Sequence, residues 1–374
     1  MSIGLLNLYS TRNLGDAAIY AALAEMCPEK NAFGVLSESK ATEVTGLRLV
    51  PRLPACDAYV SVGGEIFNNA RQLLMTKRFV GNIAAISRRA SQTMLFGQSI
   101  PGSCNGLAFG ILSTALKRLP AVVVRDINSH ARLQAAGVDA ELSYDAAFTL
   151  APEPAQIAAA HALLSKLGLS SERLAVISLR GHSHMYSETG DHAERAIASV
   201  ARRLLARGHQ VALIVQADSD YCDSDWTMCK RIRAEIPGIA VIDPIHEPSP
   251  VPAWELLAGL LAIANLVVAV RYHTAVLRLA AGRKALILYY ANKGKDLCER
   301  LGQPGMPLSA AGCEDAITLA EQSASGVFDP EPLARDVLDH FNWALGKLGA
   351  AGAMQGLNNV KSPRLVSELA QVQG

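Results

Sequence analysis

An arginine and a histidine two residues apart, Arg271 and His273, are the side chains of this sequence best suited to chemistry. They follow the apolar run 266–270, whose β-branched residues, after a long helical pattern, predict a buried parallel strand. Parallel sheets of α/β proteins bind ligands just beyond the carboxyl ends of their strands. Because side chains i and i+2 of an extended chain point the same way, we expect this pair to hold an anion beside a proton donor.

A second arginine of this kind, Arg180, follows the strand expected at 174–179. Two guanidinium groups on converging strand ends could clamp a doubly charged anion through bidentate hydrogen bonds. His182, His184 and the acidic stretches 218–220 and 223–225 resemble metal ligands, but no further ligand is spaced to complete a site. We therefore expect neither a metal nor another cofactor.

Polar residues or glycines also follow the strands expected at 3–8, 58–62, 93–96 and 121–124. In the simplest interpretation Asn13 is a plain helix N-cap, and Arg125 with Asp126 forms a salt-linked turn. Alternatively, these positions line a ligand site, since glycines permit close approach and helix starts can bind anions. The residues concerned are Asn13, Asp16, Gly63, Gly64, Gln98, Arg125 and Asp126. The sequence contains no G-x-G-x-x-G loop or Walker P-loop, the signatures of nicotinamide and common NTPase sites.

The elements that must position these residues alternate between strand and helix, which predicts parallel sheets with helices on both faces. A length of 374 residues favours two domains, and the proline-containing segment 150–154 is typical of a linker. We expect an α/β protein with two Rossmann-like domains facing each other across a cleft. The domains are predicted at 1–151 and 152–345, followed by a peripheral tail at 346–374.

The composition is that of a globular protein of the cytoplasm. Hydrophobic residues make up 50% and charged residues 18%, which is enough for a large core. The formal net charge of +1 provides no global field for nucleic acid or anionic lipid. The seven cysteines are scattered without C-x-x-C spacing, which favours a reducing compartment. The start lacks the features of a signal peptide, and the longest apolar run, 256–270, is too short to span a bilayer.

Taken in order, the motifs of the chain resemble those of the polysaccharide pyruvyl transferase family. The resemblance runs from residue 13 to about residue 301 and rests on eight short segments. They are Asn13-Leu14-Gly15-Asp16, Asp57 through Gly63-Gly64, Gly97-Gln98-Ser99-Ile100, Val124-Arg125-Asp126 with Ser129, Asp145-Ala146-Ala147-Phe148, Ser178-Leu179-Arg180, Arg271-Tyr272-His273, and Tyr290 with Lys293.

This resemblance implies the two-domain fold of B-type glycosyltransferases and a reaction in which phosphoenolpyruvate places a pyruvate ketal across two hydroxyls of a sugar. It assigns the acceptor to the first domain and the donor to the second, and it adds Tyr290 and Lys293 to the substrate-binding residues. The Arg-x-His element of the family corresponds to Arg271 and His273. Two positions depart from the family pattern: Glu65 replaces a frequent third glycine, and Pro101-Gly102 inverts the usual order.

The implied chemistry fits the residues. Phosphoenolpyruvate carries a phosphate and a carboxylate, which Arg271, Arg180 and Lys293 can bind, so no metal is required. Histidine titrates near neutral pH, which makes His273 a reasonable general acid for the methylene carbon. Asp16 or Asp126 could take the protons of the attacking hydroxyls.

Three alternatives stay open. A B-type glycosyltransferase using a nucleotide sugar would need a carboxylate for the ribose, and none is evident after the strand at 266–270. A non-catalytic binding protein could retain the fold, and the departures at Glu65 and Pro101 leave room for a small non-sugar acceptor. For the pyruvyltransferase, the expected partners are phosphoenolpyruvate and a glycan or glycan-lipid acceptor, without nucleic acid or a transmembrane segment. A homo-oligomer is compatible with the sequence.

Overall fold

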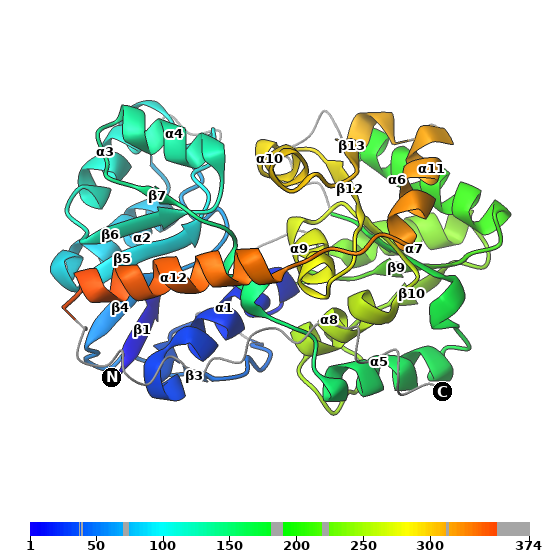
Figure 1. The fold of residues 1–374 in the computed structure, drawn as a ribbon, viewed down its shortest axis with the longest axis horizontal. Helices are drawn as coiled ribbons and strands as arrows, with labels where there is room; N and C mark the ends of the chain where they lie inside the picture. Colours follow the sequence, from blue (N-terminus) through cyan, green and yellow to red (C-terminus); the bar gives the residue numbers. More distant parts are fainter. Residues whose placement is uncertain are drawn as a thin grey trace.

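Two parallel β-sheets form the molecule, one built from each half of the chain (Figure 1). The computed structural model describes residues 1–36, 38, 40–69, 75–180, 190–218, 224–311 and 314–349. Within these residues, the first sheet has the strand order β3-β2-β1-β4-β5-β6-β7 and the second the order β10-β9-β8-β11-β12-β13. The predicted α/β architecture with two Rossmann-like units is confirmed.

The first sheet is buried on both faces, because every residue of its central strands is buried. Helices connect its strands and cover them. Its strands are β1 (Ile3–Leu6), β2 (Ala32–Gly34), β3 (Leu47–Leu49), β4 (Ala58–Ser61), β5 (Thr93–Gln98), β6 (Ala121–Val124) and β7 (Glu141–Leu142). The helices are α1 (Leu14–Met26), α2 (Lys77–Ser87), α3 (Gly106–Leu116) and α4 (Ile127–Ala135), with the short turns η1 (Pro28–Lys30), η2 (Ala90–Gln92) and η3 (Ala146–Thr149).

The second sheet repeats this plan. Its strands are β8 (Leu174–Ser178), β9 (Gln210–Ile214), β10 (Ala240–Ile242), β11 (Leu266–Ala269), β12 (Leu286–Tyr289) and β13 (Gly305–Pro307). Its helices are α5 (Pro154–Lys166), α6 (Gly190–Ala206), α7 (Asp225–Glu235), α8 (Ala253–Ile263), α9 (Tyr272–Ala280), α10 (Asn292–Leu301) and α11 (Glu314–Ala324), with η4 (Ser171–Arg173) and η6 (Leu308–Ala310). None of the helices that the structure describes is long and apolar enough to cross a membrane.

The last helix, α12 (Glu331–Lys347), returns to the first sheet (Figure 1). The sequence assigned residues 152–345 to the second domain, but α12 packs against β5, β6 and η3. The ring of Phe341 meets that of Phe96 edge to face, with centroids 5.2 Å apart. Ser143 also donates a hydrogen bond to Asp336 Oδ2 at 2.6 Å. The apolar face of α12 therefore finds its partner in the first domain, and the predicted tail beyond residue 349 lies outside the described residues.

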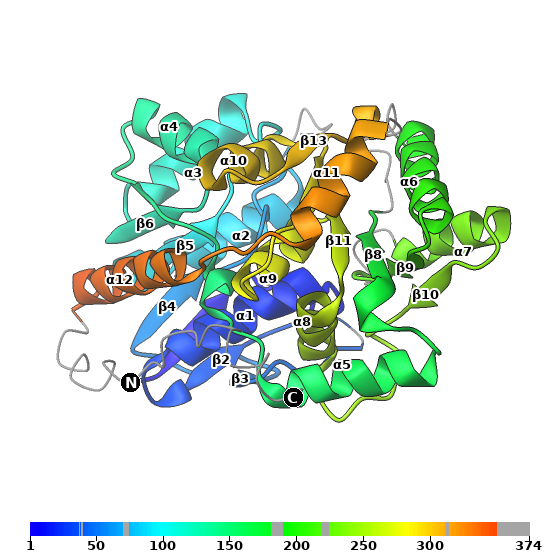
Figure 2. The ribbon, with the colours of Figure 1, turned by 45° about the vertical axis from the view of Figure 1, so that its right-hand side comes forward.

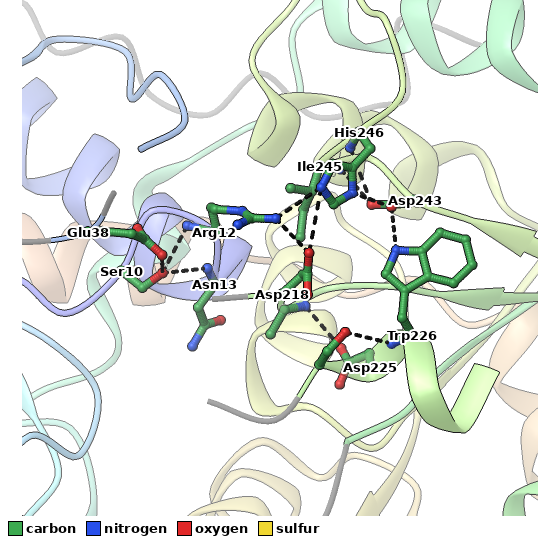
Figure 3. A network of polar contacts seen from close by, with 12 residues as sticks. Ser10, Arg12, Asn13, Glu38, Asp218, Asp225, Trp226, Asp243, Ile245 and His246 are labelled. Atoms are coloured by element: carbon green, nitrogen blue, oxygen red, sulfur yellow. Dashed lines mark hydrogen bonds and ion pairs between the residues drawn. The ribbon is translucent and has the colours of Figure 1, made fainter. Parts of the chain in front are cut away.

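The two domains touch along a polar seam near the start of α1 (Figure 3). Asn13 and Ala217 form an isolated antiparallel bridge. Arg12 Nη2 donates to Asp218 Oδ2 at 2.6 Å and to His246 Nε2 at 2.9 Å. The other ring nitrogen of His246, Nδ1, lies 2.6 Å from Asp243 Oδ2. These bonds fix the amino-terminal end of α1 against the second sheet.

Helix α10 makes a second contact between the domains, against the α4 side of the first sheet (Figure 2). Arg300 donates from Nη1 to the carbonyl oxygen of Arg125 at 2.9 Å and from Nη2 to that of Ser143 at 3.1 Å. Asp296 Oδ1 accepts a long bond, 3.4 Å, from the backbone of Ile127. The loop that follows β6 is therefore held by a helix of the other domain.

Candidate active site

His273 lies in the first turn of α9, which begins at Tyr272 and runs next to α1 at the domain junction (Figure 2). Its ring faces the first domain: Nε2 is 3.4 Å from Asp145 Oδ2 and 3.5 Å from Arg125 Nη1. Arg271, the N-cap of the same helix, instead donates from Nε to Asp225 Oδ2 at 2.9 Å and from Nη2 to Asp225 Oδ1. The expected shared direction needs correction, because the extended chain ends at Arg271 and the period of two ends with it.

Arg125 is the central cation of the junction and is only 1% exposed. Its Nε donates to Ser99 Oγ at 2.9 Å, its Nη1 donates to Asp145, and its plane lies over the ring of Tyr272, 4.7 Å from the centroid. Burial opposes ionisation of Asp145, but the charges of Arg125 and His273 outweigh it and lower the pKa of that carboxyl. Nη2 of Arg125 has no hydrogen-bond partner within the described part of the chain. A buried donor left unpaired costs about 1–3 kcal/mol, so we expect this atom to bond to a water molecule or a ligand.

Two glycines pack closely against Arg125 and His273. A Cβ added to Gly64 would lie 3.2 Å from Arg125 Nη2 and 3.7 Å from Asp16 Oδ1. A Cβ at Gly15 would lie 2.3 Å from His273 Nδ1, so only glycine lets α1 pack this closely against the histidine. Gly64 therefore lies close to both Arg125 Nη2 and Asp16 Oδ1, and the His273 ring lies beside Arg125.

Asp16 stands in the first turn of α1 and is 7% exposed. Its Oδ2 accepts a bond from Asn13 Nδ2 at 2.9 Å, while Oδ1 of Asn13 caps the helix by accepting from the Gly15 backbone. Burial raises the pKa of Asp16, against the opposing charges of His273 and Arg125. A carboxylate with a raised pKa is a stronger base than an exposed aspartate, as proton abstraction from a hydroxyl requires.

The second domain contributes two more cations. Lys293, in the first turn of α10, has its Nζ 3.0 Å from Glu65 Oε2. Arg180, after β8, donates to the hydroxyl of Tyr290 and stacks over that ring. Burial tends to raise the pKa of Tyr290, but the charges of Arg180 and Lys293 prevail and lower it. The predicted Arg180, Tyr290 and Lys293 are thus brought together, and Glu65 joins them from the first domain.

The remaining predicted residues have different surroundings. Asp126 caps α4: its Oδ1 accepts from the Ser129 backbone at 2.8 Å and its Oδ2 from the Ser129 hydroxyl at 2.6 Å. Both carboxylate oxygens are thereby engaged, which favours the simple capping interpretation. Gln98 is fully buried; its Nε2 donates to Ser61 Oγ at 3.0 Å, while Oε1 has no partner among the described residues. Gly63 has a φ of +119°, a conformation that glycine adopts without strain.

Asp145 and Glu65 contact predicted site residues but were not themselves among the residues predicted for the site. For Asp145 the signal was present, because Asp145-Ala146-Ala147-Phe148 was one of the ordered motifs. The two histidines at 182 and 184 and half of the residues in the acidic stretches, Asp220 and Asp223 among them, lie outside the described residues. Among the residues described, no three His, Cys, Asp or Glu side chains are grouped so that they could hold a metal ion.

Comparison of solved structures supports the fold. A crystal structure of Anabaena Alr3699/HepE in complex with UDP and glucose matches with a TM-score of 0.55 at 12% identity, covering 94% of this chain and 100% of that one. A UDP-GlcNAc 2-epimerase from Methanocaldococcus jannaschii matches with a TM-score of 0.55 at 8% identity, covering 92% and 99%. The S. aureus MnaA–UDP structure gives 0.56 at 11% identity, covering 93% and 98%. These likenesses confirm the predicted fold of B-type glycosyltransferases.

Comparison of the sequence with curated proteins finds no significant match. A family model described as "Polysaccharide pyruvyl transferase" matches residues 13–292, which hold the seam at Asn13, the buried Arg125 and the His273 turn. The match spans well over half of the chain and includes strands of both sheets. The chain belongs to the polysaccharide pyruvyl transferase family.

Proposed function

We propose that this protein transfers pyruvate from phosphoenolpyruvate to two hydroxyls of a sugar in a glycan or glycan precursor, as a ketal, and releases phosphate. The observation that carries the proposal is the buried Arg125, whose Nη2 is unpartnered among the described residues and lies close to Gly64 and Asp16. A small anion with several oxygens satisfies such a donor. The His273 ring beside it supplies a group able to move a proton.

Phosphoenolpyruvate has two charged groups, a phosphate and a carboxylate, and we propose that cations from both domains bind them. Arg125 belongs to the first domain, and Lys293 and Arg180 belong to the second. We assign one anionic group of phosphoenolpyruvate to Arg125 and the other to Lys293 and Arg180. Arg271 then has a positioning role. Its salt bridge with Asp225 fixes the start of α9 and hence the position of His273. The proposal involves no cofactor besides the donor.

In the proposed reaction, His273 gives a proton to the methylene carbon of phosphoenolpyruvate, which becomes a methyl group. Asp145 holds the imidazole ring, because its Oδ2 lies 3.4 Å from Nε2. The adjacent carbon gains oxocarbenium character, and a sugar hydroxyl attacks it while Asp16 takes the hydroxyl proton. A second hydroxyl attacks the same carbon, the bond to the phosphate oxygen breaks, and phosphate leaves with the remaining proton. Of the two hydroxyl protons, one replaces the proton that His273 gave to the new methyl group, and the other leaves with phosphate as hydrogen phosphate.

On the acceptor side, Gln98 and Asn13 of the first domain are the proposed contacts for the sugar. Oε1 of Gln98 is a buried acceptor without a partner among the described residues, and a sugar hydroxyl can donate to it. We place the reaction in the cytoplasm, where phosphoenolpyruvate is made. The free cysteines Cys27, Cys56, Cys104, Cys229 and Cys298 are consistent with a reducing compartment.

The test is incubation of the protein with phosphoenolpyruvate and a panel of glycosides, with phosphate release and product mass as readouts. The proposal expects phosphate release that depends on the acceptor, and a product with the added mass of a pyruvate ketal. The Arg125→Lys variant keeps one charge but loses the guanidinium fork, and its activity should fall at least about tenfold. Thermal stabilisation by UDP or GDP, with none by phosphoenolpyruvate, would instead support the nucleotide-sugar glycosyltransferase.

A further inference from the structure

Glu65 forms an ion pair between the domains at the edge of the proposed donor site. It follows Gly63 and Gly64 beyond the end of β4, and its Oε2 lies 3.0 Å from Nζ of Lys293 in the first turn of α10. The two side chains are 22% and 14% exposed, so the pair is largely shielded from water. Shielding of this kind makes the attraction stronger than in a typical surface pair.

Two other carboxylates of the junction, Asp145 and Asp225, have different partners. Asp145 is bonded to Arg125, and Asp225 is bonded to Arg271 and to two backbone N–H groups. Glu65 instead faces the cation that the proposed function gives to the donor. Burial opposes its ionisation, but the charges of Lys293, Arg125 and Arg180 together lower the pKa of Glu65, so its carboxylate is charged at neutral pH.

We propose that Glu65 is an internal competitor of the donor: its carboxylate holds Lys293 in the ligand-free protein and is displaced when an anionic group of the donor binds there. This inference rests on the proposed function. Two anions that share one ammonium group repel each other. Phosphoenolpyruvate therefore binds at Lys293 only when its attraction to Lys293 exceeds that of the Glu65 carboxylate. The residue at position 65 thereby sets the affinity for the donor.

The experiment measures the dissociation constant of phosphoenolpyruvate by calorimetry for the wild type, Glu65→Gln and Glu65→Gly. Both variants remove the competing charge, and we expect each to bind phosphoenolpyruvate about fivefold or more tightly than the wild type. The matched control is Glu299→Gln, which removes the acid of an exposed pair with Lys295 on the same helix. Its dissociation constant should equal that of the wild type.

Three results overturn the inference. An unchanged or higher dissociation constant in both Glu65 variants, with wild-type melting temperatures, shows that Glu65 positions Lys293 rather than competing with the donor. A wild-type crystal structure with phosphoenolpyruvate bound and the Glu65–Lys293 pair still at 3.0 Å refutes displacement without any variant. Failure of the wild type to bind phosphoenolpyruvate refutes the proposed function itself, whereas failure of the variants alone leaves that function standing.

Discussion

The substitution Gly64→Ala places one methyl group beside Nη2 of Arg125. The added Cβ would lie 3.2 Å from Nη2, within the first contact shell of the unpartnered nitrogen. It would therefore block one approach of a substrate oxygen to this donor. A hydrogen bond to a charged group contributes about 1.5–3 kcal/mol, equivalent to a factor of about 10–150 in kcat/KM for phosphoenolpyruvate.

The fold should tolerate this change, since Gly64 does not have a positive φ and its Cβ meets no backbone atom within 4 Å. The matched control is Gly81→Ala in the middle of α2, where the new Cβ has nothing within 4 Å. Replacing a helical glycine by alanine stabilises a protein by about 0.5–1 kcal/mol, so the control should keep full activity and melt slightly higher. Phosphate release and thermal melting of both variants decide the matter. If Gly64→Ala keeps wild-type kcat/KM, the face of Arg125 next to Gly64 does not contact the substrate.

Three further predictions concern the acids and the seam. Asp16→Asn should lower kcat about 10²–10⁴-fold. In the wild type the rate should fall as pH decreases through the raised pKa of Asp16, and this acidic limb of the pH–rate profile should be absent from the variant. If the variant keeps the limb, a group other than Asp16 causes it. Asp145→Asn leaves the buried Arg125 charge unpaired and should lower the free energy of unfolding by about 3–5 kcal/mol in urea. Because the folded-state pKa of Asp145 is lowered, its carboxylate contributes its full stabilisation at pH values above the unfolded-state pKa, about 3.9. This stabilisation is lost as pH falls below that pKa, so the difference in unfolding free energy between the wild type and the variant should shrink in acid. A double-mutant cycle of Arg12→Ala and Asp218→Ala should give a coupling energy of about 1 kcal/mol, and zero coupling would show that the seam is held elsewhere.

Local patterns predicted the elements and the ends of the strands well. The apolar run at 266–270 contains β11 (Leu266–Ala269), and glycines and polar residues follow β4 and β6 as expected. Gly97 and Gln98, expected beyond the strand at 93–96, instead lie within β5 (Thr93–Gln98). These signals are local, because strand runs and turn residues are neighbours in the chain. Helix α9 begins at Tyr272, so the extended chain ends at Arg271, and the side chains of Arg271 and His273 point toward different partners. Helix boundaries are uncertain by one or two residues when they are predicted from sequence, and here such a small difference changes the direction of a side chain.

Long-range pairings could not be predicted in this way. Asp225 comes after β9 and Arg271 after β11, with β8 between these strands, and Asp145 reaches His273 from the other domain. No periodicity relates such positions, because their distance is set by how β-α units stack and how the domains dock. The return of α12 to the first sheet is of the same kind: its amphipathic pattern indicates a buried face but does not say which sheet buries it.

The candidate site combines residues of both domains, so the contact between the domains is part of it. Arg125 and Asp16 come from the first domain, and His273 and Lys293 come from the second, so neither domain contains the cluster alone. The contact is also specific, because Arg300 of α10 bonds to the carbonyl oxygen of Arg125. A shift of α10 would therefore move the backbone that carries Arg125 together with the helix that carries Lys293. It follows that donor binding, which we propose to separate Lys293 from Glu65, acts on one of the contacts that hold the two domains together.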